Sequence, residues 1–427
     1  MPSSLSDLLR STSWTLRGVR ALDPATGTDA ERDLFCVRGR LSAEPEPGAP
    51  ALDARGLLAM PAAIDAHVHF RQPGAEEAET VATGLAAAAR GGVGTVLAMP
   101  NTTPPLDSPE AIRAQFALAA AAPERRVRYL VSGCCTAGRA GAAPAPLEAL
   151  AATGAAAFTD DGAMVADDGV MEEVLRRAAA LGLPTMDHAV VPALQGLVRD
   201  GALARALGLR PFPDEAETAA VARDVALARR TGARVHLQHL SAAASVDLVA
   251  AARAEGLRVT AEATPHHLLL ACEDIPGDDA NWKMNPPLGT RADRARLREG
   301  VLDGTVSCFA TDHAPHAIAA KARGFAAAPF GVVGLETALP ATWRAMVSEG
   351  GMAPVEWARR WTTGPAELLG LPPPSLAPGA EARVALLREA PWTPAPEDLA
   401  SKSRDCPFLG MELPLRVEAL LAPVPAA

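Results

Sequence analysis

From about residue 60 the chain alternates short apolar runs with longer stretches in which apolar residues recur every three or four positions. The short runs predict strands, and the longer, alanine-rich stretches predict helices. The eight predicted strands are Ala62–Phe70, Gly92–Pro100, Arg126–Cys135, Ala155–Asp160, Pro184–Ala189, Arg234–Ser241, Arg258–His267 and Val306–His316. The predicted helices include Glu76–Arg90, Asp168–Leu181, Glu215–Thr231, Ala244–Gly256 and Arg291–Asp303. This alternation favours a (β/α)8 TIM-type barrel over an open doubly wound sheet, because no GxGxxG turn follows the first strand.

The two ends of the chain show a different pattern. Residues 1–59 carry turn signals between short extended runs, and residues 366–427 are rich in proline with a strand-like run at Ala382–Leu387. Because termini often lie near each other on a domain surface, we expect both ends to form one small β-sandwich module. Residues 60–365 would then form the barrel.

Composition and charge exclude several classes of protein. The chain has 427 residues, is 49% hydrophobic and carries a net charge of −10, which fits a globular protein and disfavours a nucleic-acid or anionic-membrane binder. The apolar runs fall short of the roughly 18–20 residues of a membrane span, and the N-terminal stretch does not read as a signal peptide. We therefore expect a cytoplasmic protein. The six cysteines lack a CxxC pair, so core packing is their expected role.

Lysine and histidine are unevenly distributed. Only Lys283, Lys321 and Lys402 are lysines among the 40 basic residues, and all nine histidines lie between His67 and His316. Any histidine chemistry therefore belongs to the middle of the chain.

Metal-competent side chains follow the predicted strands at the ends where barrel active sites form. His67 and His69 are two residues apart on a strand, so both face the same side and can bind one ion. Four more candidates stand at other strand ends, namely Asp161, His188, His239 and Asp312. Imidazole and carboxylate ligands favour zinc, although manganese or cobalt fits the same set. Six ligands exceed the three or four of a single catalytic zinc, and a carboxylate that bridges two ions would account for the surplus.

The other histidines favour supporting roles. His236 lies three residues before His239 on one strand and faces the opposite side, so we predict that only His239 is a ligand. We expect His266 and His267 to line the pocket or to support ligands, and His313 to be structural. Arg71 continues the inward parity of the histidine pair, and its guanidinium can bind a substrate carboxylate in a bidentate manner.

Six short motifs in one order resemble the dihydroorotases, most closely the bacterial aspartate-bridged (type I) class of the amidohydrolase superfamily. The motifs are Pro61–Gly74, Met99–Pro104, Phe158–Gly162, Thr264–His267, Asn285–Leu288 and Ala310–His316. The similarity extends from about residue 60 to residue 340, with weaker echoes in Pro365–Leu371 and Ser401–Leu413.

The resemblance implies a metal-dependent barrel enzyme of pyrimidine biosynthesis that interconverts N-carbamoyl-L-aspartate and dihydroorotate. The positions that match metal ligands are His67, His69, Asp161, His188, His239 and Asp312, with Asp161 bridging. The positions that match substrate contacts are Arg71, Asn101, Asn285, His316, Phe330 and Gly331. Asp312 would act as the general acid and base, and one or two zinc ions, with two favoured, would activate water. Asp160 is an alternative to Asp161 at the bridging position.

The chain also departs from the family pattern. Ala189 and Val190 follow His188 where the family often has cysteine and an acid, which leaves open whether one or two ions bind. Gln72 and Gly364 are further departures.

Two rival interpretations are weaker. Hydantoinases, dihydropyrimidinases and allantoinases generally bridge their metals with a carboxylated lysine after the fourth strand, but no lysine precedes Lys283. An inactive dihydroorotase-like scaffold for aspartate transcarbamoylase is disfavoured because every ligand position is filled. The resemblance leaves open a homodimer and an association with aspartate transcarbamoylase.

Overall fold

The computed structural model describes residues 4–423, and its centre is the predicted barrel. Seven strands run parallel in two groups, in the order β6-β7-β8 and β9-β10-β11-β12. Their bounds are β6 Ala63–Val68, β7 Val93–Ala98, β8 Arg128–Val131, β9 Thr185–Asp187, β10 Val235–Leu237, β11 Val259–Ala263 and β12 Cys308–Phe309. Each lies within a predicted strand, and the observed strands are shorter because the predicted runs include the loops that leave the barrel.

Isolated backbone bridges join the two groups into a ring. Phe158 pairs with Gly133 on one side and with Thr185 on the other, and Val68 pairs with His313. The fourth predicted strand, Ala155–Asp160, is therefore present as bridges at Phe158. The eight positions around the ring confirm the predicted barrel.

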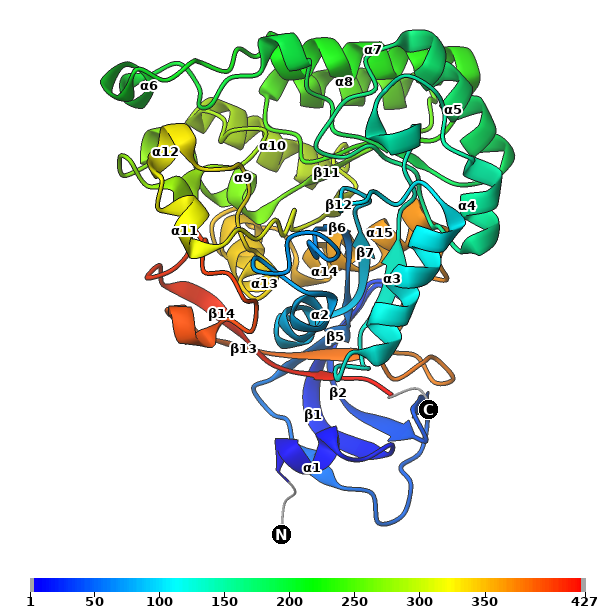
Figure 1. Cartoon of the computed structure of the whole chain (residues 1–427). Helices are drawn as coiled ribbons and strands as arrows, with labels where there is room; N and C mark the ends of the chain where they lie inside the picture. The colour runs from blue at the N-terminus through cyan, green and yellow to red at the C-terminus, as the bar shows by residue number, and fades with distance from the viewer. Residues whose placement is uncertain (1–3, 424–427) are drawn as a thin grey trace.

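Helices surround the barrel, as Figure 1 shows. Their bounds are α2 Val81–Arg90, α3 Pro109–Ala121, α4 Leu147–Thr153, α5 Asp168–Ala180, α6 Ala202–Leu207, α7 Glu215–Thr231, α8 Ala243–Ala254, α9 Pro265–Leu269, α10 Arg291–Asp303, α11 Ile318–Lys321, α12 Gly324–Ala327, α13 Ala338–Thr342, α14 Pro354–Trp361 and α15 Thr363–Leu369. The predicted bounds of α7 and α10 are confirmed. Helix α2 begins five residues later than predicted, because the side chain of Thr80 accepts a hydrogen bond from the amide of Thr83 and caps the helix there.

Both ends of the chain contribute to one seven-stranded sheet among the described residues. Its order is β14-β13-β5-β1-β2-β3, with β4 paired to β1. The bounds are β1 Trp14–Asp23, β2 Thr28–Val37, β3 Arg40–Ser42, β4 Ala51–Asp53, β5 Leu58–Pro61, β13 Val384–Trp392 and β14 Leu413–Leu421, and helix α1 covers Leu5–Leu9. In Figure 1 the blue N-terminal strands and the orange and red C-terminal strands lie side by side below the barrel. The division at residues 59 and 366 is our proposal for the boundaries of this module.

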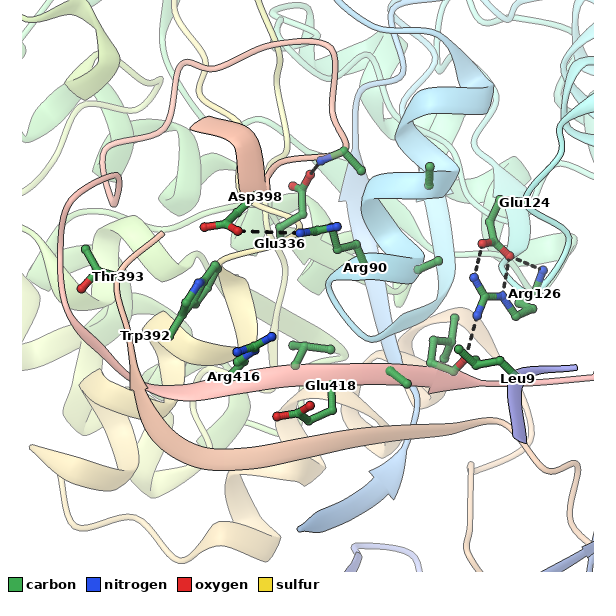
Figure 2. A pocket seen from close by; sticks show the side chains of 16 residues that line it. Leu9, Arg90, Glu124, Arg126, Glu336, Trp392, Thr393, Asp398, Arg416 and Glu418 are labelled. Atoms are coloured by element: carbon green, nitrogen blue, oxygen red, sulfur yellow. Dashed lines mark hydrogen bonds and ion pairs between the residues drawn. The ribbon is translucent and has the colours of Figure 1, made fainter. Parts of the chain in front are cut away.

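A groove of about 600 Å³ lies between α2 and β14, where the module packs against the barrel (Figure 2). Trp392 and Arg416 line it from the strands, and Arg90 lines it from the helix. The chain between β13 and β14 then reaches the barrel, where the backbone amide of Val333 donates to the carbonyl oxygen of Asp405 at 2.9 Å. Within the described residues, no helix is long and apolar enough to cross a membrane.

Candidate metal centre

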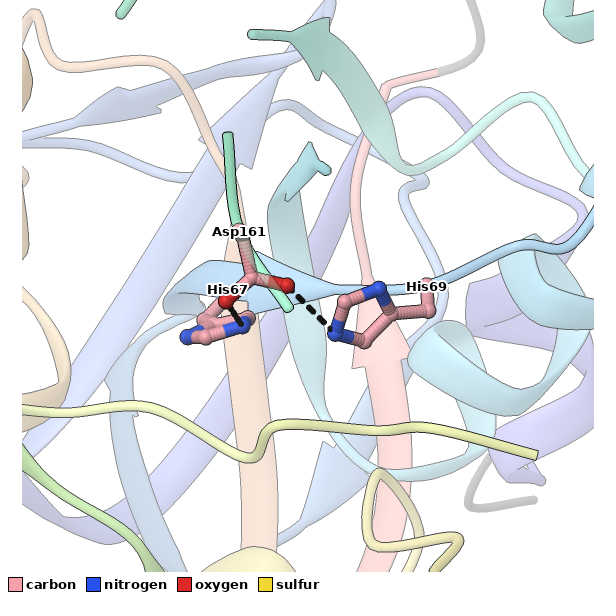
Figure 3. Close-up of side chains that lie close together, drawn as sticks. All are labelled: His67, His69 and Asp161. Atoms are coloured by element: carbon pink, nitrogen blue, oxygen red, sulfur yellow. Dashed lines mark ion pairs between the residues drawn. The ribbon is translucent and has the colours of Figure 1, made fainter. Parts of the chain in front are cut away.

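The first barrel strand delivers two buried histidines to one carboxylate. In Figure 3 the rings of His67 and His69 both point at Asp161. Nε2 of His67 lies 3.3 Å from Oδ1 of Asp161, and Nε2 of His69 lies 3.3 Å from its Oδ2. Each histidine thus faces a different oxygen of the same carboxylate, so both oxygens of Asp161 lie near imidazole nitrogens.

Two more histidines approach Asp161 from the opposite half of the barrel. His188 follows β9, and its Nδ1 lies 3.7 Å from Oδ1 of Asp161. His239 follows β10, and its Nε2 lies 3.9 Å from the same oxygen and 3.0 Å from Nδ1 of His188. Two groups of three ligand atoms therefore share Asp161, one with His67 and His69 and one with His188 and His239. Either group could hold a metal ion.

Asp312 adds a second carboxylate at the exit of the last strand. Its Oδ1 lies 3.0 Å from Nε2 of His69 and 3.5 Å from Nε2 of His67. The backbone is left-handed at Asp312, with φ of 47°, and at His239, with φ of 32°. Such angles are costly for residues other than glycine, and they tend to persist where a site requires them.

The chemistry of these donors fits divalent cations. Nε2 of His67 and Oδ1 of Asp161 are buried without a hydrogen-bond partner among the described residues. Burial acts to raise the pKa of Asp161, but the imidazoles of His67 and His69 outweigh it and hold this pKa well below the usual value. An ionised, buried and unpaired carboxylate oxygen that faces imidazole nitrogens is a suitable ligand for zinc.

A buried glutamate, which the sequence did not single out, supports His67 from behind. Oε1 of Glu262 on β11 lies 2.7 Å from Nδ1 of His67, and Oε2 lies 3.0 Å from Nε2 of His236. Burial acts to raise the pKa of Glu262, yet the charge of His67 and these hydrogen bonds lower it to about 2. Cys308 lies close to Glu262 and His236. His236 therefore lies away from Asp161, on the far side of Glu262.

Asn101 and Arg139 hold the other side of the centre. Oδ1 of Asn101 accepts a hydrogen bond from Nδ1 of His69 at 2.9 Å, which leaves Nε2 of that ring free to face the carboxylates. The guanidinium of Arg139 donates to the carbonyl oxygens of Asp160 and Asp161 at 3.1 Å and 2.6 Å. Asp160 itself turns away and accepts hydrogen bonds from Thr136. Arg139 ends the short 3-10 helix Ala137–Arg139, which has no spacing pattern in the sequence, so sequence reasoning missed it.

A cavity of about 190 Å³ opens beside the centre, and Arg71, Asn101 and His316 line it. Strand β6 ends at Val68 and the backbone of Arg71 is left-handed, with φ of 40°. The predicted strand parity therefore does not extend to Arg71. Its Nε instead donates to the carbonyl oxygen of Pro315 at 3.1 Å, which holds the guanidinium next to His316.

The remaining predicted substrate contacts are His316, Phe330, Gly331 and Asn285. Nε2 of His316 donates to the carbonyl oxygen of Phe330 at 2.6 Å. Gly331 has φ of +127°, and a Cβ there would lie 2.5 Å from the carbonyl oxygen of Ala314, so only glycine fits. The amide of Asn285 lies 2.9 Å from Nε2 of His188, and its oxygen accepts a hydrogen bond from Gln195 at 3.1 Å.

The three other histidines lie buried around the centre. His267 lies between the hydroxyl of Thr264 at 2.8 Å and the carbonyl oxygen of Pro286 at 3.0 Å, next to His266. His313 accepts a hydrogen bond from the amide of Gly334 and faces Glu79 at 3.3 Å. Their supporting roles remain a prediction from the sequence.

Sequence comparisons relate the chain to one family. A family model described as dihydro-orotase-like matches residues 56–245. A dihydroorotase of Bacillus caldolyticus is 45% identical over 362 residues, which cover 84% of each chain. A dihydroorotase of Pelotomaculum thermopropionicum is 40% identical over 402 residues, which cover 92% of this chain and 93% of that protein.

Solved structures show the same architecture at much lower identity. L-hydantoinase (dihydropyrimidinase) from Arthrobacter aurescens has a TM-score of 0.84 at 22% identity and covers 97% of this chain and 98% of that chain. Dihydropyrimidinase from Brevibacillus agri has a TM-score of 0.83 at 22% identity and covers 96% of this chain and 94% of that chain. At this identity the likeness concerns the fold alone.

Proposed function

Because the chain belongs to the dihydroorotase family and is a cyclic amidohydrolase, we propose that its metal centre and rim interconvert N-carbamoyl-L-aspartate and (S)-dihydroorotate plus water. This reaction would serve the synthesis of pyrimidine nucleotides. The observation that carries the proposal is the convergence of His67, His69 and Asp161 beside a cavity lined by Arg71.

Two ions, bridged by Asp161, are our proposal for the centre. His67 and His69 would hold one ion and His188 and His239 the other, with Asp312 completing the first set. Zinc is the metal that these nitrogen and oxygen donors favour. When bound, such ions lower the pKa of water and polarise a carbonyl oxygen.

The residues of the chain would supply proton transfer and orientation. The carboxylate of Asp312 faces the same point as His67 and His69, so it can take a proton from the attacking water and return it to the leaving nitrogen. In the biosynthetic direction the same carboxylate would take the proton from the ureido nitrogen. Burial acts to raise the pKa of Asp312, but a hydrogen bond to His69 and the charge of His67 lower it, which favours the ionised form that accepts a proton.

The rim would bind the carboxylate of the ring. Arg71 offers a planar pair of N–H donors at the cavity wall, and Asn101 lies across the same cavity. His316 is adjacent, and Phe330 and Gly331 follow it along the chain beside the cavity. These contacts would hold the scissile amide near Asp161 and Asp312, an orientation effect worth several kcal/mol.

A hydantoinase-like activity is the second candidate. Its only support is the similarity of this fold to the fold of L-hydantoinase. Two features oppose it. The position between the two histidine pairs is filled by Asp161 rather than by a lysine, and Arg71 suits a substrate that carries a carboxylate. A cytoplasmic location, a homodimer and an association with aspartate transcarbamoylase are further proposals that follow from the family.

The test is a spectrophotometric assay of dihydroorotate and of hydantoin on protein of measured metal content. We expect turnover of dihydroorotate that disappears with a chelator and returns with zinc. Preferential turnover of hydantoin would favour the second candidate. Fewer than about 0.3 ions per chain, with no reconstitution by zinc, would favour an inactive scaffold because a catalytic zinc site needs bound metal.

A further inference from the structure

Two of the three lysines of the chain meet at the segment that carries Phe330 and Gly331. This segment, residues 317–331, contains the short helices α11 and α12 and forms one wall of the site; we call it the rim segment. Lys321 belongs to the segment itself, and Lys283 belongs to the loop that precedes Asn285. Both side chains are buried, at 6% and 2% exposure.

The ammonium group of Lys321 has a carbonyl oxygen for each of its three N–H donors. It donates to the carbonyl oxygen of Gly331 at 2.5 Å, to that of Lys283 at 3.2 Å and to that of Pro329 at 3.3 Å. An ammonium carries three donors and no acceptor, so this environment satisfies it fully. One cation thus joins the two ends of the rim segment to the loop of Lys283.

The neighbouring contacts act on the same residues. The amide of Gly331 also donates to the carbonyl oxygen of Lys283, at 3.0 Å. The ammonium of Lys283 donates to the carbonyl oxygen of Ala328 at 2.6 Å and lies 4.7 Å from the centre of the Phe330 ring. Interactions of cations with carbonyl oxygens and aromatic rings are strong when buried.

Asp405 lies near Lys321 and partly offsets the effect of burial on its ammonium group. Burial lowers the pKa of Lys321, and the carboxylate of Asp405 opposes this change. Asp405 and Lys321 line the same cavity of about 540 Å³ on the outer side of the rim segment. Oδ1 of Asp405 also accepts a hydrogen bond from the amide of His316 at 3.4 Å. The segment between β13 and β14, which carries Asp405, therefore supports the hydrogen bonds of Lys321 from the outer side of the rim segment.

We infer that Lys321 is a positioning residue, whose ammonium group fixes the rim segment in the conformation that presents Phe330 and Gly331 to the substrate. The inference rests on the proposed function, since it takes Phe330 and Gly331 to contact dihydroorotate. Lys321 itself lies behind the cavity and needs no contact with the substrate.

The test compares Lys321→Met with Lys402→Met, which removes the exposed third lysine. Two quantities are measured on zinc-loaded protein: the kinetics with dihydroorotate, and the rate of trypsin cleavage after Arg323, a site that both variants keep. We expect Lys321→Met to raise KM at least about tenfold while kcat changes less than about threefold, because uniform binding energy is lost. Cleavage after Arg323 should accelerate by at least about tenfold, because the segment opens more often. Lys402→Met should resemble the wild type in both.

Each other outcome has a defined meaning. KM and cleavage within about twofold of the wild type would overturn the inference. A raised KM without faster cleavage would place Lys321 in direct contact with substrate, and faster cleavage without a raised KM would separate the segment from binding; both overturn it. If Lys321→Met does not fold, Lys321→Gln, which keeps two N–H donors, replaces it with the same two criteria. A metal-loaded wild type without turnover would refute the proposed function instead. The rate of cleavage after Arg323 in Lys321→Met would then still show whether Lys321 fixes the rim segment.

Discussion

Nδ1 of His67 lies 2.7 Å from Oε1 of Glu262, on the opposite side of the ring from Asp161. Both side chains are fully buried, so the imidazole is held between two carboxylates away from water. Burial acts to lower the pKa of His67, but Asp161 and Glu262 together raise it well above its usual value. With Nδ1–H donated to Glu262, Nε2 is the nitrogen that faces the centre. A carboxylate that accepts the N–H on the far side of a metal-binding histidine, as Glu262 does here, fixes the tautomer and orientation of the ring.

Replacing Glu262 by glutamine is therefore expected to weaken metal binding. The amide has one oxygen where the carboxylate has two, and His67 and His236 both require an acceptor. We expect the affinity for zinc to fall about 10-fold to 100-fold. Titration of the metal-free protein against a chelator of known affinity measures this, with Glu255→Gln on the exposed face of the barrel as control. Equal affinities in the two variants would mean that Glu262 only fills space.

Asp312→Ala is expected to abolish turnover while the barrel stays folded. The carboxylate is the group placed to carry the proton, and loss of a general acid and base costs about 100-fold or more. The measurement is kcat with dihydroorotate in both directions, together with metal content and thermal unfolding. Asp160→Asn is a matched comparison, because Asp160 is next to Asp161 in the chain but faces Thr136. Near-normal turnover of Asp312→Ala would rule out its assigned role.

Arg71→Met is expected to discriminate between substrates. Without the guanidinium, dihydroorotate loses its bidentate partner, whereas a ring without a carboxylate loses little. We expect kcat/KM for dihydroorotate to fall by a factor of about 100 or more, since each charged hydrogen bond is worth about 1.5–3 kcal/mol. Parallel assays with dihydrouracil supply the comparison. Equal losses on both substrates would assign Arg71 a structural role only.

The sequence predicted the barrel because its signals are local and periodic. Strand positions follow from apolar runs, and candidate ligands follow from the side chains that end them, as at His67, His188 and His239. The carboxyl ends of parallel strands meet at one rim whatever the details of the loops, so these residues were brought together without knowledge of any contact.

The sequence could not predict what depends on contacts between distant segments. Glu262 reads as an ordinary strand residue until β11 lies beside His67. Lys321 and Asp405 are 84 positions apart, and only folding brings them to one cavity. Arg71 lines the cavity for a reason other than strand parity, because β6 ends at Val68 and the backbone of Arg71 is left-handed. Such turns depend on the tertiary environment, so the alternation of a strand does not reveal them.

The ring of His316 is expected to make stability depend on pH below neutrality. Burial, followed by the nearby charge of Arg71, lowers its pKa to about 3. In the unfolded chain a histidine binds a proton near pH 6.5, so between about pH 6.5 and 3 the unfolded state holds more protons. The free energy of unfolding therefore falls as the pH falls through this window.

His316→Gln removes this contribution and isolates it from the other titrating groups. Between pH 7 and pH 5 we expect the wild type to lose about 1–2 kcal/mol more than the variant, the range allowing for partial exposure of the ring. Urea unfolding of metal-free protein at the two pH values measures the difference, because bound metal would add its own pH dependence. The carboxylates that the wild type and His316→Gln have in common change the stability of both proteins alike. If wild type and variant lose equal stability over this interval, the ring takes up its proton in the folded state as readily as in the unfolded one, and His316 is not held neutral against the carbonyl oxygen of Phe330.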